Sequence, residues 1–342
     1  MNIRKIKLDD ITRCYSTNYL KVNDELKVFF ASEDPTSVCN CYSGENFENK
    51  ELVWDDRGGC MSIIEVPNTN GEFLAVNEFY LKVSPSLSKL VWVKYVDGKW
   101  VIKDIMNLPY LHRFDIYNVD GVNYFIGATI AENKEDKEDW RLPGQIYVGV
   151  IPANIEEGIK IEKIADGMFR NHGYYRGFYD GRVCGYFTSD QGIVRVTPPS
   201  SNGEWKVEKI LEGKISEIAL VDIDGDGVEE LMTIEPFHGN SMKIYKLKDG
   251  KYECDFVYPY EIDFAHTLVG TTLAGVSCFV GGVRRVNCEL FYITYENNEY
   301  KVNIIESGVG PANVAVVNLE DKDLILSANH TKNEAAVYVV TK

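Results

Sequence analysis

The chain contains only five histidines, and imidazole is the side chain best suited to metal binding and to proton transfer near neutral pH. Neutral imidazole nitrogens bind Zn, Mn, Fe or Ni, and a site with three or four such ligands can draw them from distant parts of a chain. What matters is therefore whether the fold brings these residues together. The five are His112, His172, His238, His266 and His330.

A second group of residues has the spacing of a cation site. The segment 221–230, VDIDGDGVEE, places carboxylates at alternating positions and glycines where a tight loop must turn. Hard oxygen ligands in this arrangement suit Ca²⁺. The alternative is a solvated acidic hairpin turn without a bound ion. The expected calcium ligands are Asp222, Asp224, Asp226, the carbonyl of Val228, and Glu230.

The elements that must position these residues are predicted to be strands. The sequence is rich in Tyr (21), Phe (15) and Gly (28) and shows short alternating apolar runs with few helical stripes. The clearest unit, 216–258, reads as a four-stranded antiparallel meander with an acidic turn and a histidine-bearing loop. Six other segments repeat this order. The predicted first strands of the seven units align on positions 18, 60, 112, 172, 216, 266 and 312.

This spacing matches the roughly 40–50 residues of a four-stranded propeller blade. The longest interval contains the polar insertion 132–144, ENKEDKEDWRLPG. The last repeat has only three strands, so segment 2–8 is predicted to supply its outer strand and close the ring, which removes an exposed sheet edge. The sequence thus predicts an all-β, seven-bladed β-propeller that forms a single domain over residues 1–342.

The repeat register also predicts where the histidines lie. Three of them precede first strands, and two lie in loops between second and third strands. Both kinds of connection open on one face of a propeller, so all five are expected on one rim, above a funnel, with the acidic loop on the opposite face. The alternative is that each imidazole only bonds a backbone carbonyl. The predicted ligands of a divalent transition metal, Mn or Zn, in this funnel are His112, His172, His266 and His330.

Other groups on the same loops suit an anionic or polyhydroxylated ligand. Arginines gathered at one mouth of an acidic protein attract anions, and aromatic rings stack on sugar faces. The alternative for the tyrosines is packing between blades, and Trp140 in the insertion is a candidate lid. The predicted catalytic residues are His172, Tyr174, Tyr175, His238, Arg113 and Arg176. The predicted substrate-binding residues are Asn77, Tyr80, Trp140, Arg170, Asn240 and Arg284.

The repeat pattern, the D-x-D-G-D-G loop and the segment 234–240, IEPFHGN, together resemble the FG-GAP/VCBS propeller superfamily. The family motif ends in Asp where this chain has Glu230. Within the superfamily, the arrangement is similar to the propeller domain of aldos-2-ulose dehydratase. In architecture only, it is similar to oligogalacturonate lyase, whose family binds manganese in the funnel through histidines.

The histidine rim and these resemblances favour a carbohydrate lyase or dehydratase. A metal would polarise a sugar carbonyl or carboxylate, a histidine or tyrosine would remove the neighbouring proton, and an arginine would neutralise the enolate-like intermediate before β-elimination. Isomerisation and epimerisation share that first step. The competing hypothesis is a non-catalytic propeller that binds carbohydrate or protein. A hydrolase is a poorer fit, although four carboxylates are placed to approach the channel: Glu65, Glu78, Asp115 and Glu235.

Charge and composition limit the partners. Lys+Arg 36 against Asp+Glu 52 gives a net charge of -16 without any basic run, which argues against nucleic acid. No stretch approaches the roughly 20 apolar residues of a membrane span, and the first residues show no signal-peptide core. Eight scattered cysteines indicate reduced thiols and a cytoplasmic location. The expected partner is a small sugar or oligosaccharide, with no membrane contact.

Overall fold

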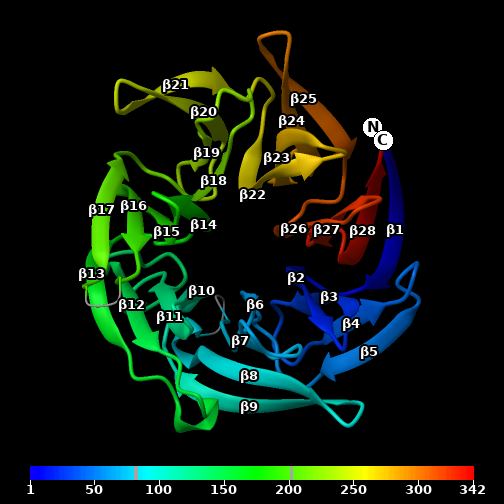
Figure 1. The fold of residues 1–342 in the computed structure, drawn as a ribbon, viewed down its shortest axis with the longest axis vertical. Coiled ribbons are helices and arrows are strands. Elements are labelled where there is room, and N and C mark those ends of the chain that lie inside the picture. Colours follow the sequence, from blue (N-terminus) through cyan, green and yellow to red (C-terminus); the bar gives the residue numbers. More distant parts are fainter. Residues whose placement is uncertain (81–83, 201–202) are drawn as a thin grey trace.

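The strands form seven four-stranded antiparallel sheets around a common axis (Figure 1). The computed structural model describes residues 1–80, 84–200 and 203–342. The seven-bladed propeller predicted from the repeats is confirmed. Among the described residues, no helix combines the length and the apolar character needed to cross a bilayer. The innermost strands of blades 1 to 7 are β2 (Cys14–Val22), β6 (Ile63–Glu65), β10 (Leu111–Val119), β14 (Tyr174–Tyr179), β18 (Glu217–Val221), β22 (Asp263–Leu273) and β26 (Asn313–Asn318).

The other strands follow outward in chain order, and two short 3-10 helices, η1 (Pro85–Leu87) and η2 (Ile155–Glu157), lie in connections. The outer strands are β3 (Glu25–Ser32), β4 (Cys39–Ser43) and β5 (Asn49–Trp54) in blade 1; β7 (Phe73–Asn77), β8 (Lys89–Val96) and β9 (Lys99–Asn107) in blade 2; β11 (Val122–Thr129), β12 (Gly144–Val150) and β13 (Glu162–Met168) in blade 3; β15 (Arg182–Ser189), β16 (Gly192–Thr197) and β17 (Lys206–Leu211) in blade 4; β19 (Glu230–Glu235), β20 (Ser241–Lys248) and β21 (Lys251–Val257) in blade 5; β23 (Val276–Arg285), β24 (Leu290–Glu296) and β25 (Glu299–Glu306) in blade 6; and β27 (Asp323–Asn329) and β28 (Glu334–Thr341) in blade 7.

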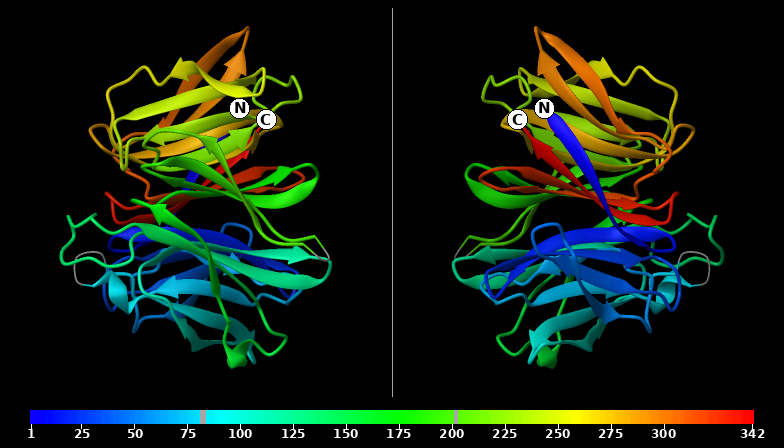
Figure 2. Two further views of the ribbon diagram at one scale, coloured as in Figure 1. Left: turned by 90° about the vertical axis from the view of Figure 1, so that its left-hand side faces the viewer. Right: turned by 90° about the vertical axis from the view of Figure 1, so that its right-hand side faces the viewer.

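The N-terminal strand β1 (Asn2–Asp10) completes blade 7, as predicted. It pairs antiparallel with β28, from Asn2 opposite Thr341 to Asp10 opposite Glu334, and Figure 2 shows the two strands side by side. The ammonium of Lys5 lies 2.6 Å from the Glu334 carboxylate, which is almost fully buried. The first strand of the chain therefore covers the edge that β28 would otherwise expose.

Asp-Gly pairs explain several of the tight turns between antiparallel strands. Asp120–Gly121, for example, connects β10 to β11 with φ values of 51° and 82°. Both values lie in the left-handed region that a two-residue hairpin turn requires and that glycine adopts without strain. The long insertion 132–144 falls between β11 and β12, so it projects from a loop and leaves the four-stranded order of blade 3 unchanged.

Aromatic and aliphatic side chains fill the space between adjacent blades. Phe29 of blade 1 and Phe73 of blade 2 are fully buried, and their ring centroids lie 5.2 Å apart. Apolar residues thus face inward at alternate strand positions, as the sequence pattern indicates. The packing fixes each inner strand at the axis, where the polar residues of interest are found.

Candidate functional site

Seven equivalent positions, one per blade, lie at or just before the start of the inner strands. In six blades, the residue two places earlier has a positive φ of 48–64°, so the backbone turns toward the axis in the same way. Two of those six turn residues are glycines, Gly59 and Gly310. The seven positions are occupied by Tyr15, Met61, His112, His172, Ser216, His266 and Ala312.

Three of these positions carry histidines that link neighbouring blades. The Nδ1 atom of His112 lies 3.2 Å from the carbonyl oxygen of His172, and His172 Nδ1 lies 3.2 Å from that of Ser216. In the same way, His266 Nδ1 lies 2.6 Å from the carbonyl oxygen of Ala312. A carbonyl oxygen only accepts hydrogen bonds, so each Nδ1 must carry the proton. In the neutral ring, each Nε2 then holds a free lone pair.

A cluster of three histidines forms around the Nε2 atom of His172. The Nε2 atom of His238 lies 3.1 Å from it, and one nitrogen of each of His172, His238 and His266 lies within 4.8 Å of the others. Phe237 and Phe264 stack on the His238 ring, with centroids 3.9 Å and 4.3 Å away. We call these three residues the histidine cluster.

Loop geometry brings His238 into this cluster. It follows β19 and adopts a φ of 46°, a left-handed conformation that costs a non-glycine residue about 1–2 kcal/mol. The neighbouring Gly239 permits the tight turn, because a Cβ there would lie 2.1 Å from the Glu235 carbonyl oxygen. The backbone N–H of His238 donates to Ser216 Oγ at 3.0 Å, which holds the loop over the axis.

The other two histidines have separate partners. His112 Nε2 accepts a hydrogen bond from the Tyr15 hydroxyl at 3.4 Å, and His330 Nε2 lies 2.7 Å from Glu33 Oε1. The Arg284 guanidinium is 2.8 Å from His330 Nδ1. All five histidines lie on the predicted strand-start and second-loop positions. Of the four expected metal ligands, only His172 and His266 have nitrogens that converge, and His238 joins them. The His112 ring packs 4.6 Å from that of His172, but its nitrogens do not belong to this group.

Burial keeps the cluster uncharged. His172 and His266 are each 1% exposed. Burial lowers the pKa of His172 from its usual 6.5 to about 3, with the charge of Arg113 adding to the effect. Burial likewise lowers the pKa of His238 and of His266, and nearby Arg284 reinforces both shifts. At neutral pH the three rings are therefore available as lone-pair donors.

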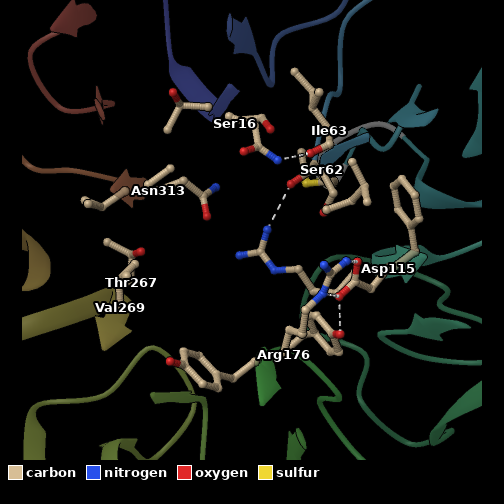
Figure 3. A pocket seen from close by; sticks show the side chains of 18 of the residues that line it. Ser16, Ser62, Ile63, Asp115, Arg176, Thr267, Val269 and Asn313 are labelled. Carbon is tan, nitrogen blue, oxygen red and sulfur yellow. Dashed lines mark hydrogen bonds and ion pairs between the residues drawn. The ribbon is translucent and has the colours of Figure 1, made fainter. Parts of the chain in front are cut away.

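An open cavity lies on the axis beyond the histidine layer, with a volume of about 630 Å³. All seven inner strands line it, and Figure 3 shows side chains such as Ser16, Asp115, Arg176, Thr267 and Asn313 gathered around one space. The lining runs from the first residues of the inner strands toward their middle. None of the described lining residues is a histidine. The predicted funnel and the predicted metal ligands are therefore in different parts of the channel.

The most ordered polar group of the cavity wall is an ion pair between blades 3 and 4. Arg176 Nε donates to Asp115 Oδ2 at 2.7 Å, and a second guanidinium nitrogen also contacts this carboxylate. Asp115 accepts a further hydrogen bond from the Tyr174 hydroxyl, which lies 2.8 Å from that of Tyr117. Two residues predicted to be catalytic, Tyr174 and Arg176, thus share one buried carboxylate.

A second buried pair lies where the cavity meets the histidine layer. Glu217 is 5% exposed, and its Oε2 atom is 3.9 Å from Arg113 and 3.8 Å from His172 Nδ1. Burial raises the pKa of Glu217 to about 7, against the opposing charge of Arg113. Arg113 also donates to the Met61 carbonyl oxygen at 2.9 Å. Glu217 therefore lines the cavity and also lies close to His172 of the histidine cluster.

The residues predicted to bind substrate lie elsewhere. Tyr175, which was predicted to be catalytic, lines the cavity, but its hydroxyl donates to the Leu220 carbonyl oxygen at 2.8 Å. The six predicted substrate-binding residues are all absent from the cavity lining. Asn77 is fully buried in blade 2, Tyr80 forms an isolated β-bridge with Ser84, and Asn240 is exposed. The other three contact neighbouring side chains: Arg284 hydrogen-bonds His330, Arg170 forms an ion pair with Asp190, and Trp140 packs on Phe237.

The insertion 132–144 lies on the histidine side of the ring. Trp140 is 5.0 Å from the Phe237 ring, which itself stacks on His238. The cationic groups of Lys134 and Arg170 lie 3.1 Å and 5.3 Å from the Trp140 ring. Trp140 therefore covers the histidine cluster from outside, and the cavity is not beneath it.

The acidic loop connects β18 and β19, as predicted, and its three aspartates converge. One carboxylate oxygen of each of Asp222, Asp224 and Asp226 lies within 4.8 Å of the others. Lys246 Nζ is 2.6 Å from Asp224 Oδ2. Glu230 is buried and accepts the Ile223 N–H at 3.0 Å, and burial raises its pKa to about 7.

A smaller pocket of about 340 Å³ lies beside His330. It is lined by Arg284, which was predicted to bind substrate, together with Arg13, Arg285 and Phe264. Both Arg284 and Arg285 stack against the Phe264 ring. Their charges are largely matched within the protein, because Glu33 faces Arg13 and His330 while Asp263 pairs with Arg285 at 3.2 Å.

The geometry defines a seven-bladed β-propeller with an axial cavity and a buried histidine cluster. No protein-family model matches the chain, and no curated protein matches it. Among solved structures, the chain is similar to Sqt1 from Saccharomyces cerevisiae, with a TM-score of 0.57 and 9% identity over 92% of this chain and 82% of that chain. At this identity the similarity shows the fold alone. Membership of the FG-GAP/VCBS superfamily stays a prediction.

Sequence reasoning missed several residues of the site. Glu217 stands directly after Ser216, so alignment of the seven strand-start positions would have placed it at the axis. Tyr15 was missed because the first strand of blade 1 was aligned on position 18, whereas in the structure this strand begins at Cys14 and Tyr15 is the residue equivalent to His112. Phe237 and Phe264 flank histidines in the sequence, but only the folded loops show that both stack on the same ring.

We expect the histidine cluster to make stability depend on pH. An unfolded histidine binds a proton below its usual pKa of 6.5, whereas folded His172 stays neutral until about pH 3. The free energy of unfolding therefore falls as the pH drops from 6.5 toward 3. In His172→Asn, the Asn amide can still donate to the Ser216 carbonyl but no longer titrates. Urea unfolding at several pH values should show a slope smaller by about 1.4 kcal/mol per pH unit. Parallel curves for the two proteins would contradict this.

Proposed function

We propose that the protein is a non-catalytic propeller that binds a small, hydroxyl-rich ligand, such as a sugar, in the axial cavity. The observation that carries this proposal is the cavity itself. Its volume of about 630 Å³ falls within the range of small-molecule sites. Side chains from seven separate strands hold its wall in place, so the site is preformed.

The chemistry of the wall supports a neutral or weakly anionic ligand. Asp115 and Arg176 neutralise each other, and Arg113 faces Glu217, whose pKa of about 7 leaves it only partly ionised at neutral pH. Hydroxyl and amide groups supply both donors and acceptors. Such a wall can satisfy the alternating hydroxyls of a sugar without a large charge.

One orphaned hydroxyl supports ligand binding. Thr17 Oγ1 is buried at the cavity wall, and it has no hydrogen-bond partner among the described residues. A buried polar atom without a partner costs about 1–3 kcal/mol. Rotation about the Thr17 χ1 angle would turn this hydroxyl toward the cavity, where a ligand hydroxyl would remove that cost.

A second candidate function is the carbon–oxygen lyase, and one observation favours it. Glu217 combines a pKa near 7 with a place on the cavity wall beside Arg113. A carboxylate with this pKa is suited to remove the proton next to a uronate carboxylate, while the guanidinium holds that carboxylate. In this lyase mechanism the general base is Glu217, whereas the sequence analysis predicted a histidine or a tyrosine in that role.

We also propose that the 222–230 loop binds Ca²⁺ as a structural ion. The three aspartate carboxylates that converge there are hard oxygen donors of the kind calcium prefers. The ammonium of Lys246, which pairs with Asp224, contributes only one positive charge against the three carboxylates. A divalent cation would reduce the remaining repulsion and favour the ionised form of Glu230.

Thr17→Val should weaken ligand binding without loss of stability. Valine keeps the shape of threonine and removes the orphaned hydroxyl. Screening mono- and disaccharides and uronic acids by calorimetry should identify a ligand that the variant binds about fivefold more weakly, equivalent to about 1 kcal/mol. The control is Thr272→Val, on β22 but outside the cavity lining. Failure of every sugar to bind, or equal losses in both variants, would contradict the proposal.

Glu217→Gln separates the two candidate functions. The amide oxygen can still accept the Tyr174 and Ile218 N–H groups, so the fold should be kept. A binding protein shows no elimination product with uronate oligosaccharides in either form. If the wild type is a lyase, ultraviolet absorbance will report the unsaturated product, and the variant will lose at least about 100-fold in rate while binding persists.

Calcium should stabilise the protein through the acidic loop. Thermal unfolding with added CaCl₂ is expected to shift upward for the wild type because only the folded loop binds the ion. Asp226→Asn keeps an oxygen to accept the Val228 N–H but removes a charge, and it should abolish the shift. Asp249→Asn, in a simple hairpin turn of the same blade, is the control that should retain it. An unchanged melting temperature for the wild type would exclude a calcium role.

A further inference from the structure

We infer that His172, His238 and His266 form a three-histidine site for one divalent transition metal ion, best matched by Zn²⁺. The inference does not depend on sugar binding, because no described residue of the cluster lines the cavity. Three lines of observation carry it: the fixed tautomers, the spacing of the nitrogens and the enclosure of the cluster.

The tautomers are set for metal binding. His172 and His266 donate their Nδ1 protons to the carbonyl oxygens of Ser216 and Ala312. A metal-binding histidine almost always donates its other ring N–H to a carbonyl or carboxylate, which orients the ring and leaves the free nitrogen as ligand. Here the two acceptors belong to the next blade, so the rigid ring of blades fixes both lone pairs.

The spacing is close to that of a tetrahedral site. With Zn–N bonds of about 2.0–2.1 Å, two nitrogens on one zinc ion lie about 3.3 Å apart. The Nε2 atoms of His172 and His238 are 3.1 Å apart. A ligand nitrogen of His266 lies within 4.8 Å of both, so a side-chain movement of about 1.5 Å would complete the set.

Without an ion, a hydrogen bond must hold the cluster together. His172 Nε2 has a lone pair, so His238 must donate its Nε2 proton across the 3.1 Å contact. Metal binding replaces that hydrogen bond, and His238 then carries its proton on Nδ1. This exchange involves a loop residue held at a strained φ of 46°, a feature that is concentrated at functional sites.

Aromatic rings enclose the cluster, so its three nitrogens bind an ion against the nearby charges of Arg113 and Arg284. Phe237 and Phe264 enclose His238, and Trp140 lies over Phe237. The Glu217 carboxylate lies 3.8 Å from His172 Nδ1 and 3.9 Å from Arg113, and a cation bound to the cluster would favour its ionised form. An all-imidazole set favours zinc over Mg²⁺ or Ca²⁺, which prefer oxygen. Three protein ligands would leave a fourth position open for water.

The test is zinc binding by the full chain after chelator treatment. Competition with a chromophoric zinc chelator, in calcium-containing buffer that occupies the acidic loop, should give one tight equivalent. Cobalt substitution supplies a second readout, since tetrahedral Co²⁺ gives intense visible absorption. Absence of a tight equivalent in the wild type would overturn the inference.

Matched variants locate the ion. His172→Asn preserves the donor to the Ser216 carbonyl and removes the Nε2 ligand, so zinc should bind at least 100-fold more weakly, beyond the loss typical of an outer-shell change. His112→Asn is the control, because this histidine forms the same kind of link between blades but directs its Nε2 atom at Tyr15. It should bind zinc like the wild type.

His238→Ala provides an independent variant, because this imidazole does not hydrogen-bond the main chain of a neighbouring blade as His112 and His172 do. This loop residue is only partly buried, so the fold should tolerate the change. We expect zinc affinity to fall as far as in His172→Asn and the cobalt spectrum to disappear. Equal zinc affinity in all three variants, or loss in His112→Asn alone, would show that the ion binds elsewhere and would overturn the assignment.

Discussion

The hydrogen bond from a buried imidazole to the main chain of the next blade is the interaction on which the axial structure depends. It occurs at three of the seven strand-start positions, and each one joins two blades where the ring is narrowest. Burial favours the neutral ring, and the neutral ring must place its proton on Nδ1 to satisfy the carbonyl. One interaction therefore sets protonation, tautomer and orientation together. At the outer edge, the pairing of β1 with β28 completes the same closure.

This arrangement divides the channel into two compartments. The buried histidine layer lies at one end, and the hydroxyl-, amide- and carboxylate-lined cavity lies beyond it. Glu217 connects them, because its carboxylate faces Arg113 of the cavity wall and His172 of the cluster. A charge placed next to Glu217 from either side would shift its ionisation.

The fold could be predicted from sequence because each blade repeats a local signal. Asp-Gly hairpins, alternating apolar strands and the unpaired N-terminal strand are all properties of short segments. The alignment of the repeats also predicted that the histidines lie on one rim. The sequence could not predict which imidazoles are in contact. His112 and His172 occupy equivalent positions in their blades. However, the Nε2 atom of His112 accepts a hydrogen bond from Tyr15, whereas the Nε2 atom of His172 contacts His238.

The sequence also could not predict where along the channel the cavity lies. Trp140 and Arg284 were expected to surround a funnel. Instead, Trp140 packs on Phe237 and Arg284 donates a hydrogen bond to His330, so both lie on the histidine side. The polar wall comes instead from strand residues, Asp115 and Arg176 among them, whose periodicity resembles that of any half-buried strand. Side chains contributed by several blades decide which end of a channel is filled, and a single repeat does not contain that information.

The most direct test of this account is the tautomeric state of the histidines, measured by ¹⁵N-detected long-range NMR correlations of the side chains at neutral pH, with each residue assigned by its Asn variant. The account predicts that His112, His172 and His266 are neutral with the proton on Nδ1 and an unprotonated Nε2. Protonation on Nε2, or a charged imidazolium at any of the three, would contradict it.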